Sequence, residues 1–170
     1  DTVLSALDDI EKQLARGQSE LVANATVIGC TLAKVTIDNQ LWSWPRDAII
    51  VDEASMAGVP HVMALAATAP RTLACFGDFR QLPPIAISEA AGARSWFGRD
   101  VFEVANVVER VEAGETDPRL AILRTQYRMG ETIAGAVSEL AYFSLLASHV
   151  DAIARGHELA ALSPMAGNEV

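Results

Sequence analysis

Two adjacent carboxylates, Asp52 and Glu53, directly follow a short apolar run, Ala48 to Val51. At the end of a buried strand, the first acid of such a pair can bind hydrated Mg²⁺ and the second can orient an attacking water. The same two acids could instead begin the next helix, because negative side chains are favoured near its positive dipole end. This segment alone leaves both interpretations open.

A longer pattern, Gly-Asp-Phe-Arg-Gln-Leu-Pro-Pro-Ile, runs from Gly77 to Ile85 after another apolar run. Gly77 allows the chain to leave a strand in a tight turn, and Pro83 and Pro84 stiffen the end of the pattern. The Gln81 amide can donate to a phosphate and accept from a water. The alternative is a Pro-rich surface turn, but the length of the specified pattern favours a functional segment.

A third segment, Leu123 to Met129, places the ring of Tyr127 beside the guanidinium of Arg128. Together they could stack on a base and contact a terminal phosphate. Taken by itself, the segment is more typical of an ordinary surface helix start.

The elements that must position these residues have an α/β pattern. Short apolar runs predict strands at Ala25 to Cys30, Ala48 to Val51 and Thr72 to Phe76. Each lacks polar alternation, which is typical of strands covered on both faces. An Ala-rich segment, Val59 to Ala69, has Pro60 in its first turn and Pro70 beyond its end, and predicts a helix. Strand, helix and strand in this order predict a right-handed crossover and a parallel sheet.

In an open parallel sheet, ligands bind at the carboxyl ends of the strands. There the sequence places Thr31, the pair Asp52 and Glu53, and the pair Gly77 and Asp78. Helices are also expected on either side of this region: an amphipathic one from Val3 to Leu21, pieces within Ala86 to Val108 broken near Gly92 and Gly98, and one from Glu131 to Phe143. The polar stretch Glu112 to Pro118 is the best candidate for a domain boundary.

Composition narrows the class of protein. A hydrophobic content of 51% and a charged content of 21% exclude a disordered chain, and a net charge of −9 argues against bulk electrostatic coating of nucleic acid. No membrane span is expected, because the longest uncharged stretch, Ala54 to Pro70, contains two prolines and His61. Cys30 and Cys75 are expected to be buried, reduced thiols of a cytoplasmic protein.

The segments together, in this order, resemble the motor core of superfamily 1 DNA/RNA helicases, in the branch that contains the RNA-decay helicases. Val51 to Ser55 resembles their Walker B motif, Gly77 to Ile85 their third motif and Leu123 to Met129 their fourth. Ala25 to Thr31 is similar, over a shorter stretch, to the strand and threonine that contact single-stranded nucleic acid. The resemblance implies a RecA-like P-loop NTPase fold, a parallel sheet with flanking helices.

The resemblance also implies roles for individual residues. Asp52 would hold Mg²⁺, Glu53 would activate water and Gln81 would sense the γ-phosphate of ATP. Gln126 and Tyr127 would bind the nucleotide, with the Tyr127 ring on adenine, and Arg128 would be an arginine finger. Thr31 would touch the backbone of single-stranded DNA or RNA.

Two departures from the family pattern stand out. Gly130 and Glu131 follow Met129 where many members have His-Pro, and no GxxxxGK[ST] loop occurs in the 170 residues. We therefore expect a fragment: residues 1–118 as the C-terminal part of a first RecA-like domain and 119–170 as the start of a second. The remainder of the helicase polypeptide would supply the phosphate loop, so the fragment alone is expected to be inactive.

Two other functions remain open. One is a non-catalytic RecA-like interaction module that has lost nucleotide binding. The other is a metal-dependent nuclease using Asp52, Glu53 and Asp78, which would need a further acid or histidine at the same strand ends.

Overall fold

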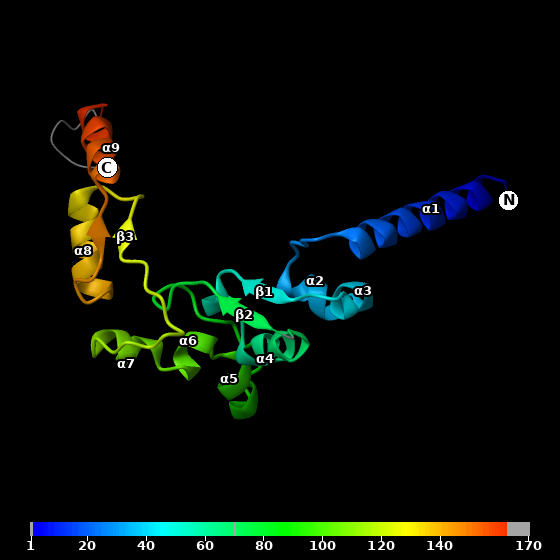
Figure 1. The fold of residues 1–170 in the computed structure, drawn as a ribbon, viewed down its shortest axis with the longest axis horizontal. Helices are drawn as coiled ribbons and strands as arrows, with labels where there is room; N and C mark the ends of the chain where they lie inside the picture. The colour runs from blue at the N-terminus through cyan, green and yellow to red at the C-terminus, as the bar shows by residue number, and fades with distance from the viewer. Residues whose placement is uncertain (1, 70, 163–170) are drawn as a thin grey trace. The chain divides into compact units, whose positions relative to one another are not determined.

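The computed structural model describes residues 2–69 and 71–162, which fall into two compact units (Figure 1). The first unit lies within residues 1–78 and 83–104, and the second within 79–82 and 105–170. The chain thus crosses from the first unit to the second at Asp78 and returns at Pro83. The expected boundary between residues 118 and 119 stays a prediction.

The first unit contains the predicted strand, helix and strand. β1 (Ala48–Val51) pairs in parallel with β2 (Thr72–Cys75), in a register that sets Val51 opposite Cys75. Between them run the 3₁₀ turn η1 (Ala54–Met56) and α4 (Val59–Thr68), with Pro60 in its first turn as predicted. Pro70 lies outside the described residues. The other helices of this unit are α1 (Thr2–Asn24), α2 (Leu32–Ile37), α3 (Asn39–Ser43), α5 (Ala91–Phe97) and α6 (Val101–Val104).

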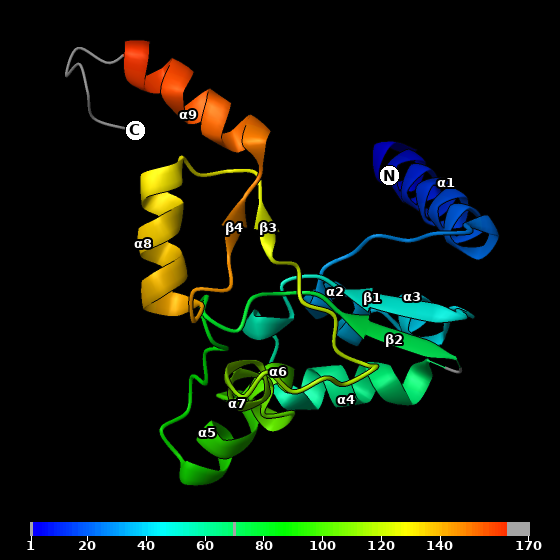
Figure 2. The same ribbon diagram turned by 60° about the vertical axis from the view of Figure 1, so that its left-hand side comes forward.

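The core of the first unit gathers around the end of β1, with α4 beside the two strands (Figure 2). Its buried members come from α2, α3, β1, η1 and α4: Val35, Leu41, Val51, Ala54 and Leu65. The core therefore anchors the strand end at which Asp52 and Glu53 follow.

The expected strand at Ala25 to Cys30 is wrong. These residues are irregular, and Val27 and Cys30 are exposed. A run of β-branched residues forms a strand only where a neighbouring strand accepts its hydrogen bonds, and among the described residues β1 pairs with β2 alone. The prediction of a buried Cys30 is wrong for the same reason, whereas Cys75 is half-buried on β2.

The expected burial of both sheet faces is also wrong. The Ile50 side chain is 71% exposed although Val51, its neighbour on β1, is buried. Successive side chains of a strand point to opposite faces. One face of the β1–β2 pair is therefore packed on the core, while the other is open within the described residues.

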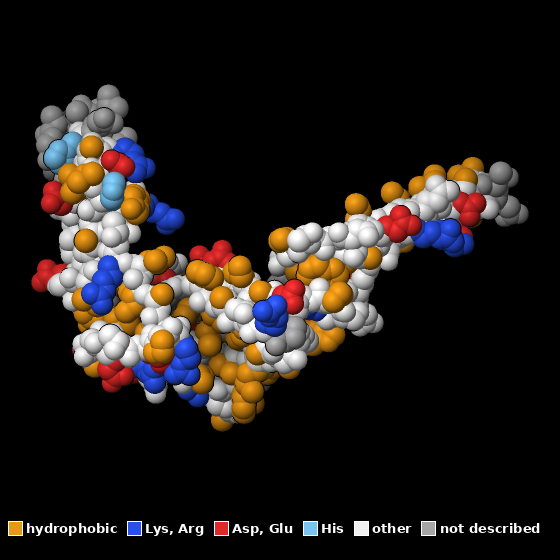
Figure 3. Space-filling view, viewed as in Figure 1, with side chains coloured by type: hydrophobic (Ala, Val, Ile, Leu, Met, Phe, Trp, Pro, Cys, Tyr) orange, Lys and Arg blue, Asp and Glu red, His pale blue; other side chains and the backbone are white. Residues whose placement is uncertain are grey.

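The predicted amphipathic helix at the amino end is confirmed as α1, and its apolar side chains stay on the surface along one side (Figure 3). They are Val3, Leu4, Leu7, Ile10, Leu14 and Leu21. The predicted break near Gly98 is confirmed, because α5 ends at Phe97, but a helical piece before Gly92 is wrong, since residues 86–90 are irregular and α5 begins at Ala91. None of the helices within residues 2–69 and 71–162 combines the length and hydropathy that a membrane span needs.

The second unit contains α7 (Val107–Glu112), β3 (Thr125–Gln126), α8 (Glu131–Ala141), β4 (Ala147–Ser148) and α9 (Val150–Leu162). α8 confirms the helix predicted from residue 131, and 113–118 is irregular as expected of the polar stretch. β3 and β4 form a second parallel pair that the sequence did not predict. The described residues thus form a mixed α/β fold with two small parallel sheets.

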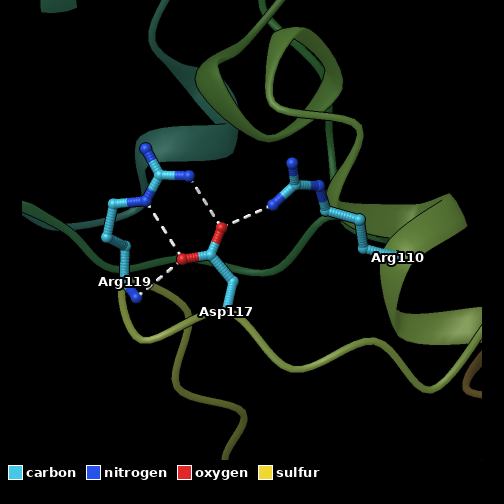
Figure 4. A network of polar contacts seen from close by, with 3 residues as sticks. All are labelled: Arg110, Asp117 and Arg119. Atoms are coloured by element: carbon cyan, nitrogen blue, oxygen red, sulfur yellow. Dashed lines mark hydrogen bonds and ion pairs between the residues drawn. The ribbon is translucent and has the colours of Figure 1, made fainter.

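In the second unit, a charged network holds the segment that leads away from α7 (Figure 4). The Asp117 carboxylate accepts from Arg110 Nη1 at 2.5 Å and from Arg119 Nε at 3.0 Å and Nη2 at 2.8 Å. Hydrogen bonds from Arg119 and then Arg110 hold the pKa of Asp117 well below its usual range. This network fixes the path of the chain before β3.

Candidate functional site

Asp52 and Glu53 follow the carboxyl end of β1, a strand in a parallel pair, as the sequence predicts. Both side chains are exposed, and Asp52 Oδ1 accepts the Glu53 backbone N–H at 3.1 Å. The exposed carboxylates are hard oxygen ligands of the kind that Mg²⁺ prefers, with its remaining positions left to phosphate oxygens and water. The pair therefore fits a Mg²⁺ that arrives with a nucleotide.

Glu53 has a left-handed backbone, with φ 51° and ψ 44°. For a residue other than glycine this conformation costs about 1–3 kcal/mol and persists only where the surroundings enforce it. Here Ala54 N donates to Phe76 O at 2.8 Å, and Met56 N donates to Glu53 O at 3.0 Å. Before Glu53, Phe76 N donates to Val51 O at 2.8 Å, so the abrupt turn from β1 into η1 is held on both sides of Glu53.

Gly77 closes the same corner from β2. A Cβ on Gly77 would lie 2.9 Å from Ala54 N, 3.2 Å from Ser55 N and 3.0 Å from a ring carbon of Phe102. The close approach of the two backbones, rather than an unusual φ, is what requires glycine here. Ser55 is 1% exposed, and none of the described residues hydrogen bonds to its hydroxyl.

The next residues of this pattern, Phe79 to Leu82, belong to the second unit. Arg80 Nε donates to Ala141 O at the end of α8 at 3.0 Å, and its guanidinium lies 5.2 Å from the centre of the Phe143 ring. The Phe79 ring meets Tyr142 edge-on, with centres 6.1 Å apart. Gln81, the predicted γ-phosphate sensor, is exposed in this anchored segment.

Gln126 organises the turn after β3. Its Oε1 accepts from Arg128 N at 2.8 Å and from Met129 N at 2.7 Å, and its Nε2 donates to Met129 O at 2.9 Å and Ser148 Oγ at 2.7 Å. An amide has two donor hydrogens and two acceptor lone pairs, so the chain itself occupies all four. The structure thus gives Gln126 a role in shaping the turn, while its predicted nucleotide contact stays a prediction.

Tyr127 and Arg128 are presented at the surface by this turn. Arg155 Nη2, from α9, donates to Tyr127 O at 2.8 Å, and both predicted side chains are exposed. A Cβ on Gly156 would lie 3.1 Å from Gly130 Cα, so α9 packs closely on the end of the turn. β3, α9 and Gln126 together fix the backbone and leave the Tyr127 and Arg128 side chains accessible.

Thr31, the predicted nucleic-acid contact, caps α2: its Oγ1 accepts Lys34 N–H at 3.1 Å. Of the predicted residues, Asp52, Glu53 and Thr31 therefore belong to the first unit. Gln81, Gln126, Tyr127 and Arg128 belong to the second. Among the described residues, no group of three or more His, Cys, Asp and Glu side chains could hold a metal ion.

Several supporting residues were missed by sequence reasoning. The left-handed Glu53, the anchoring of Arg80 on α8 and the stacking of Tyr127 on His149 all depend on contacts between distant segments. For Gln126 a local signal existed, because a side chain can hydrogen bond backbone groups two or three residues further along the chain.

Comparison with known proteins gives a family and two named relatives. The profile of the AAA domain family matches residues 2–89. DNA-binding protein SMUBP-2 of Mesocricetus auratus is 33% identical over 160 residues, which are 91% of this chain and 15% of that protein. The uncharacterized ATP-dependent helicase MJ0104 of Methanocaldococcus jannaschii is 28% identical over 140 residues, 82% of this chain and 19% of that protein. The chain thus spans less than a fifth of either relative.

Proposed function

Because the chain belongs to the AAA domain family, we propose that it forms part of the motor of an ATP-dependent helicase or translocase of superfamily 1. Similarity to a DNA-binding protein and to an ATP-dependent helicase supports this proposal. The observation that carries it is the Asp52–Glu53 pair, exposed at the end of a parallel strand with Glu53 locked in a left-handed turn. ATP, Mg²⁺ and single-stranded DNA or RNA are its proposed ligands, and a cytoplasmic location is part of the proposal.

Each proposed role rests on side-chain chemistry. Asp52 holds Mg²⁺, which when bound neutralises charge on the phosphates. Glu53 orients the attacking water, and Gln81 contacts the γ-phosphate. Arg128 stabilises the charge that develops on the transferred phosphoryl group, and Tyr127 stacks on the base. Thr31 contacts the nucleic-acid backbone.

The remainder of the proposal concerns the polypeptide outside the chain. A phosphate-binding loop with GxxxxGK[ST] is absent from these 170 residues, so the rest of the helicase polypeptide supplies it. Residues 1–118 then form the C-terminal part of a first RecA-like domain and 119–170 the start of a second. The 170 residues alone are expected neither to bind ATP tightly nor to hydrolyse it.

Two substitutions in the longer polypeptide test the carboxylate roles. Glu53→Gln should keep Mg-ATP binding and lower turnover about 10²- to 10⁴-fold, because it removes charge and keeps shape. Asp52→Asn should raise the Mg²⁺ concentration needed for half-maximal hydrolysis. The matched control is Asp47→Asn, an exposed acid just before the opposite end of β1, which should behave as wild type. Wild-type turnover for Glu53→Gln would overturn the assignment.

The second candidate is a non-catalytic interaction module that keeps the RecA-like fold but has lost nucleotide binding, which a longer polypeptide without a GxxxxGK[ST] loop would favour. The same assays separate the two. Mg²⁺-dependent ATP hydrolysis by the longer polypeptide that is lost in Glu53→Gln supports the motor, whereas a longer polypeptide without nucleotide binding supports the module.

A further inference from the structure

The Tyr127 ring is half of an aromatic pair. It stacks on the imidazole of His149, with ring centres 4.5 Å apart and planes inclined by 29°. The two residues are 22 positions apart in the sequence, and the pairing of β3 with β4 brings them together. Even with this partner, Tyr127 remains 54% exposed.

Both members of the pair are fixed by the second unit's backbone. His149 N donates to Gln126 O at 2.9 Å, which continues the ladder between β3 and β4. The Tyr127 carbonyl accepts from Arg155, and Gln126 holds the next two residues of the turn. At its outer edge, His149 Nδ1 lies 3.3 Å from both the backbone nitrogen and a carboxylate oxygen of Asp151. The imidazole plane is therefore set by β4 and the start of α9 rather than by Tyr127.

An aromatic ring has two faces, and His149 covers only one of those of Tyr127. A flat side chain packed behind a ring restricts its rotation, so the uncovered face is already oriented when a second planar group arrives. We propose that His149 is a positioning residue that backs Tyr127, so that the nucleotide base, Tyr127 and His149 form a three-layer stack. This inference rests on the proposed function, in which Tyr127 stacks on the base of ATP.

The proposal predicts an effect on ground-state binding. Truncating His149 leaves the Tyr127 ring in place but free to turn, which costs part of the stacking interaction. His149→Ala should raise KM for ATP about 2- to 10-fold and leave kcat within about twofold. Tyr127→Ala removes the stacking surface itself and should raise KM about 5- to 100-fold.

A conservative variant and a matched control distinguish support of the Tyr127 ring by His149 from a nonspecific loss of structure. His149→Phe keeps a flat ring but loses the contacts of Nδ1 with Asp151, so it should restore part of the lost KM, to a value between those of wild type and His149→Ala. His157→Ala, an exposed histidine on α9, is the matched control and should change neither constant. Because the stack involves only the base, inhibition by inorganic tripolyphosphate should be equal in wild type and His149→Ala.

The experiment is a steady-state ATPase assay of the longer polypeptide with saturating single-stranded nucleic acid. A raised KM in His149→Ala, partly rescued by His149→Phe and without weaker tripolyphosphate inhibition, supports the proposal. A lowered KM would overturn it, because His149 would then occupy the face that the base needs. Equal losses for ATP and tripolyphosphate would overturn it as well, since they indicate damage to the phosphate site.

The outcomes also separate this inference from the proposed function. If Tyr127→Ala raises KM and His149→Ala matches wild type, only the backing role fails. If Tyr127→Ala itself leaves KM unchanged, the base-stacking role of Tyr127 fails, and the three-layer stack fails with it.

Discussion

The end of β1 and the turn after β3 both carry proposed site residues, yet different kinds of bonds hold them. In the first unit the corner around Glu53 is fixed by backbone groups: Phe76 N donates to Val51 O and Ala54 N to Phe76 O, both at 2.8 Å. In the second unit the turn around Tyr127 is fixed by side chains, through the four hydrogen bonds of Gln126 and the contact from Arg155.

This difference determines how cleanly each region can be probed. At the end of β1, the Glu53 side chain can be replaced without touching the bonds that shape the corner, provided that Gly77 is kept. Asp52 Oδ1 accepts the Glu53 backbone N–H, and Asp52→Asn retains an oxygen that can accept it. In the turn after β3, some side chains make the hydrogen bonds that shape the turn, whereas others only project from it. The Arg128 side chain is of the second kind, because its backbone nitrogen rather than its guanidinium bonds to Gln126.

The largest effect is expected from Arg128→Ala in the longer polypeptide. The substitution keeps the backbone bond to Gln126 and removes a charge that would stabilise the transition state, a loss that typically costs about 10³- to 10⁵-fold in rate. Nucleotide affinity should change little. Arg124→Ala, an exposed arginine just before β3, is the matched control and should keep its rate. A wild-type kcat for Arg128→Ala would show that Arg128 is an ordinary surface residue with no role in hydrolysis.

A smaller effect, on stability, is expected from Gly77→Ala in the backbone-held corner. The added Cβ would lie 2.9 Å from Ala54 N, where neither backbone can move without breaking the bond to Phe76, so the free energy of unfolding should fall by about 1–3 kcal/mol. Gly92→Ala is the opposite control, because nothing lies within 4 Å of its Cβ position inside α5. Alanine there should stabilise by about 0.5–1 kcal/mol. Urea unfolding measures both, and equal midpoints for the two variants would contradict the close approach.

How far the sequence could predict these regions depends on the range of the interactions. The position of Asp52 and Glu53 at the end of a strand could be predicted, because a short β-branched run and the acids after it are local signals. An equally apolar run, Ala25 to Cys30, is not a strand, since pairing depends on a neighbour that its own residues do not specify. β3 and β4 have only two residues each, too few for any periodicity, so the stack of Tyr127 on His149 could not be predicted.

Gln126→Ala should show that the turn after β3 is held by a side chain. The substitution removes four hydrogen bonds of a half-buried amide, with Arg128 N, Met129 N, Met129 O and Ser148 Oγ. The free energy of unfolding should therefore fall by about 1–2 kcal/mol. Gln40→Ala is the control: its amide makes only two bonds, both to Ser19 and both exposed to solvent, so the substitution should cost less. If Gln40→Ala were the more destabilising variant, the turn would not depend on Gln126.

The smallest effect is expected at Asp117, where charge rather than a neutral amide fixes the chain before β3. Its side chain is 12% exposed, but its partner Arg119 is 83% exposed, so water and salt screen the network. Because the pKa of Asp117 lies below its usual value of 3.8 in the folded chain, the charged form stabilises the fold at neutral pH. That contribution is lost as the pH falls below about 4, when the unfolded chain takes up the proton first. Urea midpoints of wild type and Asp117→Asn should therefore differ at pH 7 and at pH 5. The two midpoints should begin to converge below about pH 4, where the Asp117 carboxyl of the unfolded chain takes up its proton. A gap between wild type and Asp117→Asn that widens below pH 4 would mean that the two arginines do not hold the carboxylate in its charged form.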